Sequence, residues 1–183
     1  MRYRDTVKIA LSAAETGHLV LSTLHTVNAG ETINRVLGMF EAEEQEQLRT
    51  RLSDSLRWVI SQRLAPKIGG GRQALLEIMG SNMRIQETIR LGESEGKSFY
   101  EIIDASYTFG WRTFDQACLE AFDHGLISEE TAMLYCTKRS VVSRAIDNIK
   151  KARGEVTSTL SSLRMKAGGK TVGAEEPVAL KFK

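Results

Sequence analysis

A single apolar run near the N-terminus limits the folds open to this chain. Residues 19–26 are LVLSTLHT, in which apolar and small hydroxyl side chains continue until a histidine and a threonine end the run. A short apolar run of this kind is typical of a strand buried on both faces, and such a strand needs neighbours on both sides. Either a later hairpin supplies the rest of the sheet, or the chain starts in the middle of a larger sheet. We favour the second interpretation.

The end of this predicted strand is a candidate binding site. Ligands of open α/β sheets bind beyond the carboxyl ends of the strands, which is where His25 and Thr26 fall. The alternative stays open at this point: a lone histidine after a strand is often only a solvated loop residue.

Apolar side chains recur at helical spacing on both sides of the run. The expected helices are residues 6–14, one that starts after an N-cap at Asn28, 43–60, 84–91, 98–106, 113–123, one that opens at Ser128, and 141–153. Leu48, Leu52, Leu56, Val59 and Ile60 would form the buried face of the helix over 43–60. Two short strands, 64–68 and 73–79, flank a turn of three glycines and predict a hairpin.

Composition excludes several classes of protein. The 183 residues carry a net charge of +2, which is too small to indicate nucleic acid or an anionic membrane as a partner. No apolar run approaches the roughly 20 residues that a transmembrane segment needs. The two cysteines, Cys118 and Cys136, form no CxxC pair, so we expect reduced thiols and no metal site.

Several segments together resemble one known family. The histidine-box region of the type II/type IV secretion ATPases is similar to AAETGHLV at 13–20, TLHT at 23–26 and TINR at 32–35. The pilus retraction (twitching motility, PilT-like) branch is similar to SQRL at 61–64, the segment 85–90 and GWRTFDQ at 110–116. The assembly branch carries a four-cysteine zinc insert after Gln-Arg-Leu, whereas this chain continues directly into APKI. The resemblance covers residues 1–153.

The resemblance implies an α/β fold: the C-terminal portion of a RecA-like P-loop NTPase domain followed by a helical bundle. Residues 1–80 would be a partial RecA-like ATPase core, 81–153 a C-terminal helical subdomain and 154–183 a mobile tail. The phosphate loop, the aspartate box and the Walker B glutamate would all lie upstream of Met1. We therefore expect a truncated chain or a misplaced gene start. Gly169-Lys170-Thr171 is no substitute phosphate loop, because Arg164 stands where that motif needs glycine.

The function that the resemblance implies is that of a fragment of a hexameric ATP-driven motor that retracts type IV pili. ATP and Mg²⁺ would be bound at subunit interfaces of the full-length protein, with the Mg²⁺ ligands outside this chain. The implied partners are a homo-hexamer and the pilus inner-membrane platform protein, at the cytoplasmic face of the bacterial inner membrane. We expect no ATP hydrolysis by this chain alone. The alternative is a non-catalytic interaction module that docks to intact motor subunits or to the platform.

Residue-by-residue matching assigns roles near the nucleotide. His25 matches the family histidine near the γ-phosphate, where an imidazole can stabilise charge, and Thr23 and Thr26 could add hydrogen bonds to ATP. Arg2 lies next to the position of the Walker B glutamate and could carry a catalytic charge. It could equally be a frayed terminus. The family has aspartate where this chain has Tyr3.

Four further residues would serve subunit contact or coupling. His18 opens the predicted strand, roughly 20 Å from His25 if the strand is extended. Ile85, Ile89 and Arg90 match the family's Ala-Ile-Arg-Asn-Leu-Ile-Arg element. Gln86 replaces the first arginine of that element.

Overall fold

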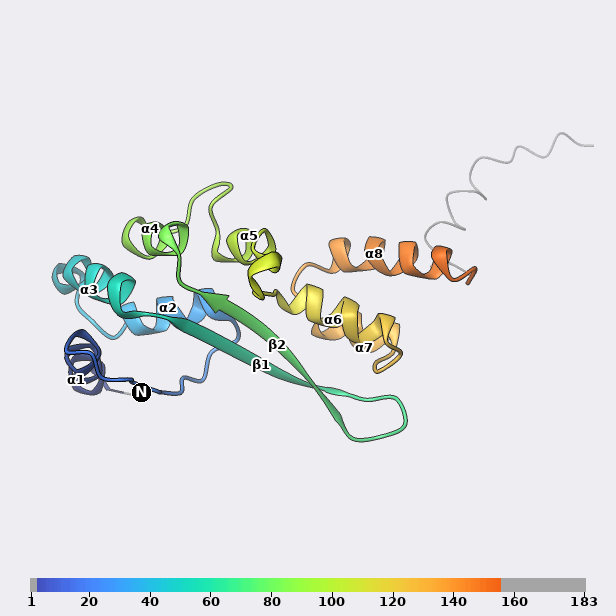
Figure 1. Ribbon diagram of the computed structural model, residues 1–183, viewed down its shortest axis with the longest axis horizontal. Helices are drawn as coiled ribbons and strands as arrows, with labels where there is room; N and C mark the ends of the chain where they lie inside the picture. Colours follow the sequence, from blue (N-terminus) through green and yellow to red (C-terminus); the bar gives the residue numbers. More distant parts are fainter. Residues whose placement is uncertain (1–2, 156–183) are drawn as a thin grey trace, which may run out of the picture.

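The computed structural model of the protein describes residues 3–155. Arg2 and most of the predicted tail therefore lie outside the described residues. The elements in chain order are α1 (Arg4–Glu15), α2 (Ala29–Leu37), α3 (Ala42–Ser55), β1 (Trp58–Pro66), β2 (Arg72–Gly80), α4 (Met83–Leu91), α5 (Phe99–Asp104), the 3-10 turn η1 (Tyr107–Phe109), α6 (Phe114–Asp123), α7 (Glu129–Tyr135) and α8 (Arg139–Ala152) (Figure 1). The chain is thus α/β, with helices on both sides of one long hairpin.

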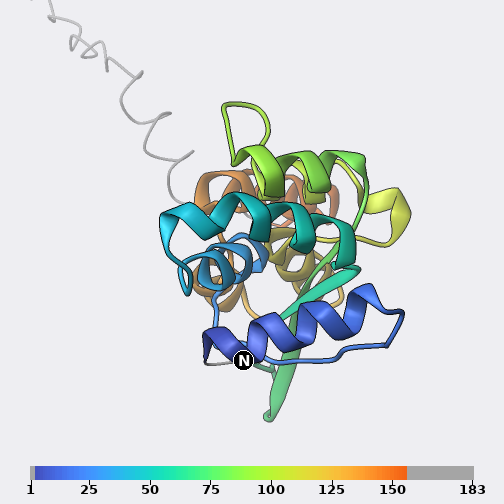
Figure 2. The ribbon, with the colours of Figure 1, turned by 90° about the vertical axis from the view of Figure 1, so that its left-hand side faces the viewer.

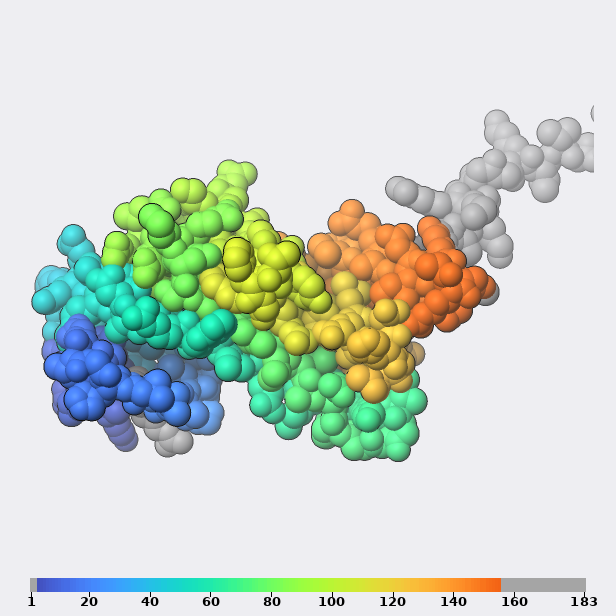
Figure 3. All heavy atoms as spheres, viewed as in Figure 1, coloured from blue at the N-terminus to red at the C-terminus, as the bar shows by residue number. Residues whose placement is uncertain are grey.

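The predicted hairpin is confirmed, with longer strands than expected. β1 pairs antiparallel with β2, so that Trp58 lies opposite Gly80 and Pro66 opposite Arg72. The three glycines of the connecting turn all have positive φ angles, between 82° and 103°, a conformation that glycine adopts at no steric cost. The tip is attached to the helical part, since the Ile68 amide donates to the carbonyl of Leu126. In Figure 3 the hairpin tip lies below α6 and α7.

The helix expected over residues 43–60 ends earlier, at Ser55, so this boundary was wrong. Val59 and Ile60 belong to β1, where Val59 is buried and Ile60 is 64% exposed. The physical reason is that β1 is buried or half-buried at every second position from Val59 to Ala65, which is the period of a strand, and that Val59 and Ile60 are β-branched residues, which favour strands. Val59 and Ile60 were expected on one face of a helix, whereas in β1 their side chains point to opposite faces of the hairpin.

The apolar run forms no strand, and the prediction of a buried strand is wrong for this structure. Residues 18–26 have no regular secondary structure, and the side chains of Leu19 and Leu21 are 86% and 85% exposed. Within the described residues the only sheet is the two-stranded hairpin, so no strand pairs with the run. Figure 2 shows the segment running as an open connection from the end of α1 to α2. An apolar run cannot be a buried strand where no sheet surrounds it.

The hairpin contributes to two hydrophobic cores. Its open end supplies Val59 and Met79 to the first core, which also holds buried residues of α1 to α5. The half nearer the turn supplies Ala65 and Leu75 to the second core, which lies among α6, α7 and α8. Helices α4 and α5 thus pack with the helices that precede the hairpin. The domain boundary expected after residue 80 stays a prediction.

Four of the expected helix starts are confirmed by their caps, whereas α1, α4 and α8 start one or two residues earlier than expected. The side chain of Asn28 accepts from the Glu31 amide at 2.8 Å, and Ser128 caps α7 in the same way. Ser98 and Thr113 form capping boxes at the starts of α5 and α6. No helix between residues 3 and 155 is long and apolar enough to cross a membrane.

Candidate functional site

Residues 18–27, named here the histidine segment, carry three of the predicted nucleotide contacts. His25 is exposed, and Thr23 lies on the exposed part of the same segment. The Thr26 hydroxyl lies 2.7 Å from the hydroxyl of Thr32, which donates to the carbonyl of Asn28 at 2.9 Å. Thr26 is therefore held at the start of α2. The roles of all three residues toward ATP stay predictions.

The C-terminal end of the histidine segment is attached to the hairpin. A guanidinium nitrogen of Arg63, on β1, donates to the Val27 carbonyl at 3.3 Å. Two residues further on, the Ala29 amide donates to Oε1 of Glu77, on β2, at 2.8 Å. Arg63 and Glu77 both lie on the inner face of the hairpin, because Arg63 pairs with Leu75 and side chains alternate between the faces.

Glu77 is the most deeply buried carboxylate at this junction, with 3% of the residue exposed. Burial raises the pKa of Glu77 above its usual value, because a charged carboxylate loses its hydration there. The hydrogen bond from the Ala29 amide and the positive charge of Arg63 oppose this rise. The carboxyl therefore fixes the start of α2 while it resists ionisation.

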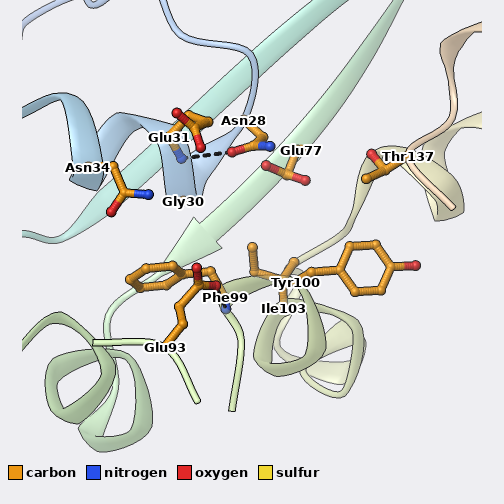
Figure 4. A pocket seen from close by; sticks show the side chains of 10 residues that line it. All are labelled: Asn28, Gly30, Glu31, Asn34, Glu77, Glu93, Phe99, Tyr100, Ile103 and Thr137. Carbon is orange, nitrogen blue, oxygen red and sulfur yellow. Dashed lines mark hydrogen bonds between the residues drawn. The ribbon is translucent and has the colours of Figure 1, made fainter. Parts of the chain in front are cut away.

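A hollow of about 120 Å³ lies between α2, β2 and α5. The residues that line it are Asn28, Gly30, Glu31, Asn34, Glu77, Glu93, Phe99, Tyr100, Ile103 and Thr137. Figure 4 shows Glu77 projecting from the hairpin toward this space, with Asn28 and Glu31 above it and Phe99 below it. None of the predicted site residues that the structure describes lines the hollow. Oε1 of Glu93 already accepts from the Phe99 amide at 2.8 Å.

Of the four predicted coupling residues, His18 begins the histidine segment and the other three lie on α4. His18 is exposed after α1, with Nδ1 lying 3.1 Å from the Thr16 hydroxyl. Ile85 and Ile89 are 0% and 1% exposed and belong to the first core. Arg90 joins α4 to α3, since its Nε donates to the hydroxyl of Ser53 at 2.8 Å and its guanidinium pairs with Asp54. These contacts lie within the chain, and the coupling roles stay predictions.

Asp115 is a buried polar centre that sequence reasoning missed. The residue is 2% exposed, and Oδ2 accepts from the Tyr100 hydroxyl at 2.7 Å. Its Oδ1 accepts from the Thr137 amide at 2.5 Å, and the Lys138 amide also donates to the carboxylate. Burial, together with the hydrogen bond to Asp115, raises the pKa of the Tyr100 hydroxyl. Asp115 therefore fixes the connection between α7 and α8 to α5 and α6.

The sequence gives a signal for the buried partners of Arg63 and Glu77 but none for those of Asp115. Arg63 and Glu77 stand at inward positions of alternating strands, and a charge at such a position indicates a buried partner. Asp115 follows the cap residue Thr113, where an acidic residue is ordinary in the first turn of a helix. Nothing local indicates that its partners lie 22 and 23 residues further along the chain. Among residues 3–155 no group of three His, Cys, Asp or Glu side chains could hold a metal ion.

Comparison with known proteins identifies relatives along most of this chain. Residues 1–165 match the family described as "Type II/IV secretion system protein". The type IV pilus retraction ATPase PilT of Pseudomonas aeruginosa is 46% identical over 132 residues, which are 72% of this chain and 38% of that protein. A twitching motility protein of Neisseria gonorrhoeae is 40% identical over 133 residues, 72% of this chain and 35% of that one.

A solved structure shares the fold. The crystal structure of the pilus retraction motor PilT with bound ADP superposes with a TM-score of 0.64 at 41% identity. The match covers 79% of this chain and 40% of that one. This chain therefore spans about two-fifths of the length of these relatives.

Proposed function

Because the chain belongs to the type II/IV secretion system protein family, we propose that it supplies the C-terminal portion of an ATP-driven motor that retracts type IV pili. The relatives named for pilus retraction and for twitching motility support the retraction branch. ATP with Mg²⁺ would bind at the subunit interfaces of a hexameric ring. The ring would act against the platform protein at the inner face of the bacterial inner membrane.

His25 is the residue of this chain that we propose for contact with the γ-phosphate. The proposal rests on one observation: the chain is fixed at Val27 and at Ala29, while His25, two residues before Val27, is exposed. An imidazole on a segment fixed in this way can donate a hydrogen bond to a phosphate oxygen whose charge grows during hydrolysis. Thr23 would add a hydroxyl from the same segment. The hydroxyl of Thr26 is already bonded to Thr32, so Thr26 would support the segment first and reach ATP only after rearrangement.

The first part of the histidine segment would be a strand of a larger sheet in the assembled motor. Leu19 and Leu21 are exposed, and Leu24 packs against the first core. Burying a leucine side chain contributes about 1.5–3 kcal/mol, so two such residues favour a partner sheet. The proposal explains why the segment has a strand-like sequence and yet no regular secondary structure here, since its partner strands would come from the rest of the motor.

The test is a chimera in which residues 4–153 replace the matching part of PilT from P. aeruginosa. We expect the chimera to hydrolyse ATP and to restore twitching to a strain without its own PilT. His25→Ala should lower kcat about a hundredfold or more, the scale for loss of one donor to a developing charge. His124→Ala, an exposed histidine at the end of α6, is the matched control and should leave turnover unchanged. Equal turnover with and without His25 would contradict its assignment.

The second function, an interaction module, is favoured by one surface. Trp58, Ile60 and Leu64 are each at least half exposed along one face of β1. Purified chain added to intact PilT rings distinguishes the two functions. A motor portion alone releases no phosphate above background and leaves the ring's turnover unchanged, whereas a docking module changes that turnover at saturating chain concentration.

A further inference from the structure

Arg63 connects three parts of the chain that are far apart in sequence. One guanidinium nitrogen donates to the Val27 carbonyl at the end of the histidine segment, and the other donates to the Tyr135 carbonyl at the end of α7, at 2.5 Å. The guanidinium also lies 3.8 Å from the centre of the Phe114 ring, at the start of α6. Arginine can make these contacts together because its donors form a flat, rigid fork that also stacks on aromatic rings.

The two segments that Arg63 joins are held in the same way. Arg63 binds the carbonyl of Val27, and the amide two residues later, Ala29, donates to the buried carboxylate of Glu77. On the other side Arg63 binds the carbonyl of Tyr135. The amide two residues later, Thr137, donates to the buried carboxylate of Asp115. Each segment therefore has a carboxylate of its own and shares one arginine with the other.

We propose that Arg63 is a positioning residue that couples the histidine segment to helices α6 and α7. A displacement of the α7–α8 connection moves the Tyr135 carbonyl, and the shared guanidinium transmits that displacement to Val27, two residues from His25. This inference rests on the proposed function for its biological purpose. The coupling itself is a property of the chain without nucleotide.

Hydrogen exchange of the full 183-residue chain can measure this coupling, because the Ala29 and Thr137 amides each donate to one of the two carboxylates. Coupling between two sites is reciprocal, so loosening one segment must loosen the other. Asp115→Asn weakens the hold on the Thr137 amide. Its direct charge effect on Glu77 does not pass through Arg63, so the response of the Ala29 amide is judged by how much of it disappears without Arg63. In the chain with Arg63 we expect this substitution to speed exchange of the Ala29 amide at least about fivefold, the lower end of typical coupling.

The decisive comparison repeats Asp115→Asn in a chain that carries Arg63→Met. Arg63→Met keeps an unbranched apolar stem but removes both donors, so Asp115→Asn should then change the exchange of Ala29 less than about twofold. A fall in the Ala29 response from at least about fivefold to less than about twofold means that most of the coupling free energy has been lost. If Arg63 had a purely structural role, the effects of Arg63→Met and Asp115→Asn on the exchange rates of the two amides would simply add. The effect of Asp115→Asn on the Ala29 amide would then be the same with and without Arg63.

The control is the Leu56 amide at the end of α3, which donates to the Leu52 carbonyl in the first core. Exchange of the Ala29 amide is expressed relative to that of Leu56 in all four chains, so that a general loss of stability cancels. If Arg63→Met prevents folding, Arg63→Lys replaces it, because lysine keeps the charge and lacks the fork. An Ala29 response to Asp115→Asn that is the same with and without Arg63 overturns the proposal. The experiment contains no nucleotide, so failure of the chimera to hydrolyse ATP would not alter its outcome.

Discussion

The buried carboxyl of Glu77 has opposing influences on its ionisation. Desolvation disfavours the charged form, whereas the Ala29 amide and Arg63 favour it, and the net effect is a raised pKa. Glu77 therefore contributes stability to the folded chain while it is protonated. That contribution is fully present below the unfolded value of 4.5 and is lost as the pH rises through the folded pKa.

Glu77→Gln tests this sign. Glutamine keeps an oxygen that can accept from the Ala29 amide and does not ionise. We expect the free energy of unfolding of the natural chain to fall relative to that of the Glu77→Gln variant as the pH rises from 4.5 to about 7, because only the natural chain must ionise a buried carboxyl. Urea unfolding of both chains at the two pH values measures the difference. If the natural chain instead becomes relatively more stable at the higher pH, the net pKa shift has the opposite direction.

At the scale of elements, the histidine segment differs from the helices around it in how little of its apolar surface is buried. Its residues Leu19 and Leu21 are almost fully exposed, whereas Leu24 packs on the first core. Replacing both exposed leucines by serine should change the free energy of unfolding of this chain by less than about 0.5 kcal/mol per substitution, as for other surface positions. Chemical denaturation followed by circular dichroism measures this value.

The same pair of substitutions should destabilise the PilT chimera, where we propose that the segment is a buried strand. Leu24→Ala is the comparison within the isolated chain, and it should cost more than either serine substitution because Leu24 contacts the core. A large loss of stability in the isolated chain from the substitutions at Leu19 and Leu21 would show that these side chains are buried in solution.

Sequence reasoning predicted the elements whose signals are local. The caps at Asn28, Ser98 and Ser128 were confirmed because a capping side chain bonds to an amide three residues away. The strand over 19–26 failed because a strand depends on neighbours that its own residues do not encode. Steric requirements set by distant residues could not be predicted either. A Cβ on Gly80 would lie 2.5 Å from the Trp111 indole, 31 positions further along the chain, so this position requires glycine.

In the candidate site, too, local motifs could be predicted from the sequence and long-range contacts could not. The resemblance located the histidine segment and the Gln-Arg-Leu and Thr-Phe-Asp-Gln motifs. It gave no indication that Arg63 stacks on Phe114, or that Asp115 holds the α7–α8 connection, because these contacts cross 51 and 22 residues. Residue types predict the chemistry of a contact, whereas the fold decides which residues meet.

At the scale of the whole molecule, the hairpin links the two cores. The same two strands contribute Val59 and Met79 to the first core and Ala65 and Leu75 to the second. A rigid pair of strands shared in this way predicts that the cores unfold together, since loss of either core removes packing from the same hairpin. Small single domains usually unfold cooperatively in this way.

Ile146→Ala tests the linkage, because Ile146 is fully buried in the second core and both tryptophans lie outside it. Truncating a buried isoleucine costs about 2–5 kcal/mol. If the cores unfold together, the urea midpoint from tryptophan fluorescence, which reports on Trp111 in the first core and on Trp58 at the open end of the hairpin, falls as far as the midpoint from circular dichroism. Ile9→Ala, at a position 71% exposed on α1, should move neither midpoint. A fluorescence midpoint that stays in place after Ile146→Ala would mean that the hairpin carries two independent cores, and the Arg63 link would then join two bodies rather than two parts of one.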